Sequence, residues 1–157
     1  MTAAEFTPDL PRIRVLVAVL RSGLIPQGNS YLCRLDSDGE VTGMCCLGVA
    51  SHVALSFGLS LEVGQVMRTS LLTQGNAEVR TYAGAYEFWP HEVQEWYGIM
   101  NQNPLLNTPE KGLKTATWLN DCGGDTRTGR PLSYIADCFE LTYLPDEYYA
   151  RYPERKR

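Results

Sequence analysis

The sequence has few of the residues that bind metal ions or cross-link small proteins. It contains two histidines and five cysteines, and no two cysteines have the spacing of two to four residues that is typical of zinc ligands. The odd count, with Cys45 and Cys46 adjacent and unable to bridge without strain, argues against a disulfide framework. We therefore predict reduced, mostly buried thiols, no metal site and no cofactor.

Nucleotide-binding fingerprints, basic stretches and membrane segments are also lacking. There is no phosphate loop ending in Gly-Lys-Ser/Thr, and no Gly-x-Gly-x-x-Gly follows a predicted strand. A net charge of −4 gives no basic footprint, which excludes nonspecific nucleic-acid binding. No apolar run approaches the roughly 18 residues that span a bilayer, and no basic segment followed by an apolar one opens the chain. We expect no membrane association and a cytoplasmic location.

The sequence does contain enough apolar residues for one core. A chain of 157 residues buries roughly 68–70% of its unfolded surface. The longest uncharged stretch with helical apolar spacing covers 46–57 and predicts a buried central helix, ended by Gly58. It follows residues 30–44, where the turn residues Asp36-Ser37-Asp38-Gly39 predict a β-hairpin. We predict an α+β fold: a mainly helical single domain over 1–157 with a β-hairpin packed on a buried central helix.

Further helices are predicted on both sides of this unit. Thr7-Pro8-Asp9 has the composition of a helix start, with Thr7 as the cap. Apolar residues follow it at helical spacing, namely Leu10, Ile13, Leu16, Val17 and Leu20. Later helices are expected after Pro90, over 115–121 and over 132–141. Residues 59–87 are predicted to be either a variable insertion or a second hairpin, and 145–157 a partly ordered tail that packs through its tyrosines.

Several short motifs follow one another along the chain. They are Leu20-Arg21-Ser22-Gly23, Gln27-Gly28, Cys45-Cys46-Leu47-Gly48-Val49, Trp89-Pro90-His91-Glu92-Val93 with Trp96 and Gly98, Leu119-Asn120-Asp121 and Ile135-Ala136-Asp137. In this order they resemble an uncharacterised family of small tailed-bacteriophage proteins with relatives in actinobacterial genomes. The resemblance covers most of the chain except about 59–87, and it implies a phage origin without an activity, cofactor or partner. Two features depart from that family: 121–129 is longer, and Trp89 replaces a more usual aliphatic residue.

Catalysis by cysteine would require a thiolate, a histidine base and an orienting group. Cys45 or Cys46 could combine with His52 or His91, and Asn120 or Asp121 could orient the base. Core packing explains the two cysteines better, because they begin an apolar helix. Cys46 and His52 are therefore weak catalytic candidates, and whether the chain is an enzyme stays open, with binding favoured.

Polar and aromatic residues in the second half are stronger candidates for a ligand pocket. Asn120 and Asp121 lie at a predicted helix end, where capping is the simpler explanation and would contribute about 0.5–2 kcal/mol each. Arg127 and Arg130 flank a glycine-containing loop and form the only basic cluster outside the first predicted helix and the tail. The predicted ligand-binding set is Asn120, Asp121, Arg127, Arg130, Trp89, Trp118 and Asp137.

These features favour binding over chemistry. We predict a small phage-encoded protein in the cytoplasm of the host bacterium that modulates a host system, such as antiviral defence. It would either sequester a nucleotide-like ligand or occlude a host protein through exposed aromatic residues, and it could form a homo-oligomer. The alternatives are a small hydrolase that uses Cys46 and His52, or a purely structural accessory protein of the phage.

Overall fold

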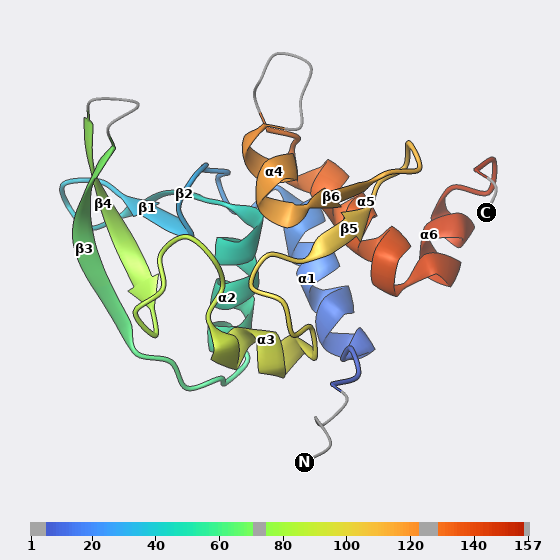
Figure 1. The fold of residues 1–157 in the computed structure, drawn as a ribbon, viewed down its shortest axis with the longest axis horizontal. Helices are drawn as coiled ribbons and strands as arrows, with labels where there is room; N and C mark the ends of the chain where they lie inside the picture. Colours follow the sequence, from blue (N-terminus) through green and yellow to red (C-terminus); the bar gives the residue numbers. More distant parts are fainter. Residues whose placement is uncertain (1–5, 71–74, 123–128, 156–157) are drawn as a thin grey trace.

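The computed structural model describes residues 6–70, 75–122 and 129–155. These residues form an α+β domain in which an antiparallel sheet and a layer of helices enclose one core, and a small separate hairpin lies beside the C-terminal helices (Figure 1). The predicted fold class is confirmed. No helix within the described ranges is long and apolar enough to cross a membrane.

The central helix α2 (Cys46–Ser56) passes between the sheet and the other helices, as its uncharged sequence predicts (Figure 1). Leu47, Val49 and Val53 are all buried. Gly48 permits a close approach of two backbones, because a Cβ built there would lie 1.7 Å from the carbonyl oxygen of Leu32. The helix therefore packs directly on the backbone that leads into the sheet.

Two hairpins build the four-stranded sheet. The predicted one pairs β1 (Cys33–Leu35) with β2 (Val41–Met44). The second, β3 (Val63–Ser70) with β4 (Gly75–Tyr82), is paired along its whole length, so 59–87 contains the hairpin that was one of its two predicted alternatives. The strand order β2-β1-β4-β3 places the 59–87 hairpin beside β1 and leaves β3 at an edge.

Helix α1 (Leu10–Ser22) buries four of the five predicted core residues, namely Ile13, Leu16, Val17 and Leu20. The predicted cap is wrong: Asp9, not Thr7, accepts a hydrogen bond from the backbone N–H of Arg12 at 3.1 Å. The backbone N–H of Asp9 donates to the carbonyl of Tyr97, which lies outside the helix. Asp9 is therefore the residue that precedes the first helical turn. Leu10 is the first helical residue and stays exposed.

The region after the sheet contains two short helices and a small hairpin. Helix α3 (His91–Tyr97) ends at Gly98 and buries Val93 and Tyr97, while Trp96 is only half-buried. The hairpin of β5 (Leu105–Asn107) and β6 (Leu113–Thr115), which the sequence pattern did not predict, leads into α4 (Ala116–Asp121).

The C-terminal helices close the core. Helix α5 (Leu132–Tyr143), predicted over 132–141, directs Ile135, Ala136, Cys138 and Phe139 into the core. Residues 145–157, predicted to pack through their tyrosines as a partly ordered tail, begin with a helix, α6 (Pro145–Arg151), and Tyr148 is fully buried against the domain. Together α1, α5 and α6 form the side of the domain away from the sheet (Figure 1).

Candidate functional site

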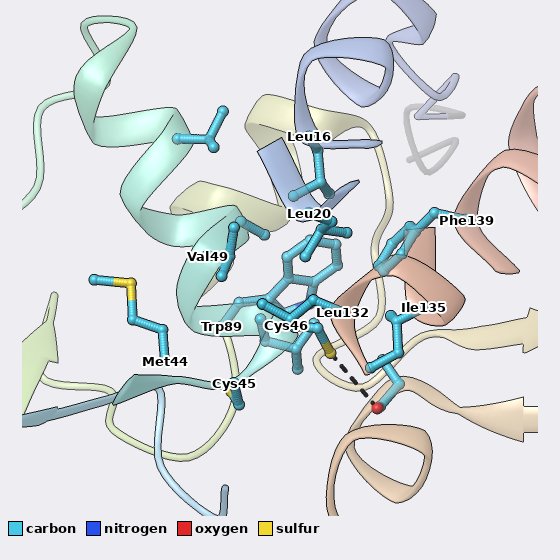
Figure 2. Packing of buried hydrophobic residues seen from close by; sticks show 14 of the residues in the cluster. Leu16, Leu20, Met44, Cys45, Cys46, Val49, Trp89, Leu132, Ile135 and Phe139 are labelled. Carbon is cyan, nitrogen blue, oxygen red and sulfur yellow. Dashed lines mark hydrogen bonds between the residues drawn. The ribbon is translucent and has the colours of Figure 1, made fainter. Parts of the chain in front are cut away.

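The weak catalytic pair is not brought together. Cys46 is completely buried, and its Sγ lies 3.5 Å from the carbonyl oxygen of Ala116 in a core that includes Trp89 and Ile135 (Figure 2). Burial raises the pKa of Cys46 well above its ordinary value, which disfavours a thiolate. His52 lies six residues along the same helix, a rise of about 9 Å, and on another side of it. A thiolate–imidazole pair of Cys46 and His52 is therefore not formed.

Asn120 is almost completely buried and joins three segments of the chain. Its Oδ1 accepts hydrogen bonds from the backbone N–H of Cys46 and from Gln27 Nε2, both at 3.1 Å. Its Nδ2 donates to the carbonyl of Gly28 at 2.8 Å and to Asp121 Oδ1 at 2.9 Å. Since Cys45 makes no side-chain cap, Asn120 caps α2 from 74 residues away.

Asp121 and the segment after the loop complete this junction. Asp121 Oδ1 also accepts from the backbone N–H of Ser30, a residue with a φ of 68°. The carbonyl of Arg130 accepts from Gln27 Nε2 at 2.8 Å. A Cβ on Gly129 would lie 1.4 Å from the carbonyl oxygen of Asn120. These contacts give both residues structural roles: Asn120 caps α2 rather than its own helix, whereas Asp121 accepts from Ser30 and Asn120 and caps no helix of the described ranges.

Two predicted residues, Arg130 and Trp118, instead line a hollow beside this junction. The hollow, of about 270 Å³, lies between the β5–β6 hairpin, α4 and the start of α5. The Arg130 guanidinium lies over the Tyr134 ring at 4.5 Å, and Lys114 Nζ lies 4.7 Å from the centroid of Trp118, which is 42% exposed. We call the four residues Lys114, Trp118, Arg130 and Tyr134 the cation–aromatic hollow.

Glu110 supplies a negative charge at the rim of the cation–aromatic hollow. Its Oε1 lies 3.9 Å from the Arg130 guanidinium, and its Oε2 accepts a short hydrogen bond from the Tyr134 hydroxyl. That hydrogen bond holds the pKa of Glu110 below its ordinary value, and burial together with the same bond raises the pKa of Tyr134. Glu110 is therefore an ionised acceptor at neutral pH, and Tyr134 a neutral donor.

A larger and more open hollow, of about 800 Å³, lies on the other side of the β5–β6 hairpin. Apolar side chains of Leu113, Leu141 and Pro145 contribute to its wall, with Lys111 and Tyr149 at its edge. Leu105 and Leu113 of the hairpin are more than half exposed. Apolar side chains of the hairpin are thus exposed beside an open hollow.

The remaining predicted residues lie elsewhere. Trp89 is buried beneath α3, stacks on Tyr97 and donates its indole N–H to the carbonyl of Asn101, so no part of it faces a ligand. Asp137 is paired with Arg21 at 2.6 Å and accepts from the Tyr152 hydroxyl, on the side formed by α1 and α6. Arg127 lies outside the described residues.

Sequence reasoning missed Lys114 and Tyr134. Lys114 lies in a three-residue strand, which is too short to show alternation. Tyr134 was interpreted only as part of a predicted helix. The available signal was Lys114-x-x-x-Trp118, a cation four residues before an exposed aromatic residue.

Comparisons with protein-family models, with curated proteins and with solved structures find no match to this chain.

Proposed function

We propose that this chain is a binding protein that sequesters a small nucleotide-like anion in the cation–aromatic hollow. The observation that carries the proposal is the pairing of two cations with two aromatic rings around one hollow, Lys114 with Trp118 and Arg130 with Tyr134. Flat rings bind bases by stacking, and Lys or Arg beside them binds phosphate. The resemblance of the sequence motifs to small phage proteins supplies the proposed setting, which is a host bacterial cell in which the ligand is a signal of antiviral defence.

The size of the hollow limits the ligand to about one nucleotide. Small-molecule sites usually have volumes of about 300–1,000 Å³, and this hollow, at about 270 Å³, lies just below that range. The exposed Trp118 ring can stack against a base while Lys114 pairs with the phosphate. Glu110 can accept hydrogen bonds from amino groups of the base.

Calorimetric titration with adenosine 5′-monophosphate, adenosine and ribose 5-phosphate tests this proposal. We expect the complete nucleotide to bind more tightly than either fragment, because each fragment loses the stacking or the charge contact. Quenching of Trp118 fluorescence should accompany binding, since Trp89 is buried and Trp96 half-buried. Lys114→Gln should weaken nucleotide binding about tenfold or more, the equivalent of about 1.4 kcal/mol.

Lys111→Gln is the matched control, because Lys111 lies on the same hairpin but lines the larger hollow. It should leave the affinity for the nucleotide unchanged. Equal affinity for adenosine and its monophosphate, or equal losses in the two lysine variants, would contradict the proposal.

The second candidate function is occlusion of a host protein by the apolar side of the β5–β6 hairpin. The observation that favours it is the exposure of Leu105 and Leu113 beside the larger hollow. Here Leu113→Asp should abolish capture of a stoichiometric host protein from infected cells, whereas Lys114→Gln should not.

A further inference from the structure

The four-stranded sheet has a long open edge at β3. The other edge strand, β2, is only four residues long, and its end is covered by residues 26–28, which bond to both backbone groups of Met44. By contrast, residues 62–69 are all exposed, and β3 lies at the outer margin of the fold (Figure 1). Proteins usually block such edges with short strands, bulges, Pro or Lys. Strand β3 is eight residues long, pairs with β4 without a break and contains neither Pro nor Lys.

The pairing of β3 with β4 shows which backbone groups of β3 point to the open edge. The backbone N–H of Ala83 donates to the carbonyl of Glu62 at 2.7 Å, so Glu62 belongs to the residues whose backbone groups face β4. Backbone groups alternate in direction along an antiparallel strand, so Val63, Gln65 and Met67 direct their N–H and carbonyl groups away from β4. The open edge therefore offers a regular row of donors and acceptors to another strand.

The side chains of β3 are complementary to a second copy of the same strand. In an antiparallel pair centred on Gln65, each Glu62 lies opposite Arg68 of the other copy, and each Val63 lies opposite Met67. Glu62 and Arg68 are exposed, and neither forms a salt bridge within the described residues. Val63 is 44% exposed and Met67 60% exposed. Opposite charges and apolar side chains would thus each meet their own kind of partner.

The two charges fix the register of this pair. Among the registers that keep outward-pointing backbone groups opposite one another, the one centred on Gln65 brings Glu62 directly opposite Arg68. Centring the pair on Val66 instead would move Arg68 two positions away from Glu62. The guanidinium of Arg68 also lies over the Tyr86 ring at 4.6 Å, which holds the side chain on the face of the sheet that Glu62 shares.

We propose that this protein forms a symmetric homodimer in which the β3 strands of two copies pair antiparallel about Gln65 and join the two sheets into one. The two Gln65 residues exchange backbone hydrogen bonds at the two-fold axis, and Val63 does so with Met67 on either side. Two salt bridges of Glu62 with Arg68 lie on one face of the joined sheet, and two apolar contacts of Val63 with Met67 lie on the other. Because every contact occurs twice, the pairing closes at two copies and covers both open edges.

Sedimentation velocity of the full chain over a dilution series tests the proposal. We expect the wild type to be a dimer that dissociates on dilution. Glu62→Arg and Arg68→Glu should each weaken dimerisation about tenfold or more, because each variant places like charges opposite one another twice. An equal mixture of the two variants should form a heterodimer, since two arginines on one copy then meet two glutamates on the other. This recovery distinguishes a lost interface from a lost fold.

Gln65→Pro tests the backbone pairing separately. Proline removes an N–H that points to the second copy rather than to β4, so this variant should be monomeric and remain folded by circular dichroism. Glu92→Arg is the matched control, because Glu92 is exposed on α3 rather than on the sheet, and it should dimerise as the wild type does. A wild type that stays monomeric at every concentration or associates only with a different protein, or a mixture of the charge variants that does not pair, would overturn the proposal.

Discussion

Asn120 uses both acceptor positions and both donor hydrogens of its amide within the protein. A local pattern can show that an Asn near a helix end is suited to capping. It cannot show which helix is capped, because the backbone N–H of Cys46 comes to Asn120 only through the tertiary fold. The choice between cap and ligand residue could therefore be stated from the sequence but not decided.

Substitution of Asn120 by Ala should lower the free energy of unfolding by about 1–3 kcal/mol. The change leaves the N–H of Cys46 and the carbonyl of Gly28 without their partners in a buried position. Chemical denaturation measures the loss, with Gln102→Ala, at an exposed position, as a control that should stay within about 0.5 kcal/mol of the wild type. A loss equal to that of the control would mean that the junction contributes nothing to stability.

Among the elements, the helices with three or more core-facing positions at helical spacing were predictable. Helices α1, α2 and α5 lie within a few residues of their predicted positions. The β5–β6 hairpin and α6 were not found, because strands of three residues are too short to show alternation and α6 buries a single residue, Tyr148. Their places are set by packing, as the burial of Tyr148 shows.

Gly48→Ala should destabilise the protein by at least about 3 kcal/mol, at the upper end of the effects of overpacking. The added methyl group would meet the backbone of Leu32, which cannot move aside without disrupting the start of β1. Gly112→Ala is the comparison, since its nearest neighbour would be the Thr108 hydroxyl at 3.5 Å. Thermal melting of both variants provides the measurement. Similar melting temperatures for the two variants would show that α2 can move away from β1 at little cost.

The contact between α1, α5 and α6 should make stability depend on pH. Burial raises the pKa of Glu140, but hydrogen bonds from Arg151 and Arg21 outweigh it and hold the pKa below its ordinary value of 4.5. The folded state therefore favours the carboxylate, and its contribution is complete above pH 4.5 and declines as pH falls through the lower folded-state pKa.

Unfolding free energies of the wild type and of Glu140→Gln, measured between pH 7 and pH 3, check this expectation. The free energy of unfolding of the wild type should exceed that of Glu140→Gln by the largest amount near pH 7, and this wild-type advantage should shrink below about pH 4.5. The exposed Glu87→Gln should show no such pH-dependent difference. A wild-type advantage that stays constant down to pH 3 would exclude Glu140 as its source.

For the whole molecule, the sequence predicted the fold class better than the site. Seven candidate ligand residues were named, and the fold distributes the six that the structure describes. Trp118 and Arg130 share one hollow, Asn120 and Asp121 bond to Cys46 and Ser30, and Trp89 and Asp137 are in separate parts of the domain. Composition identifies aromatic and basic residues but not their neighbours. Lys114 and Tyr134 enter the hollow only because the β5–β6 hairpin and the start of α5 both lie against it.

The central claim, sequestration of a nucleotide-like anion, is tested most directly by native mass spectrometry of the tagged protein recovered from infected bacterial cells. We predict a complex heavier than the 157-residue chain by the mass of one small molecule per protein. Heat should release that molecule as an ultraviolet-absorbing, phosphate-containing compound, and Lys114→Gln should be recovered without it. Recovery of the wild type without any bound small molecule, or with a stoichiometric host protein in its place, would contradict the account.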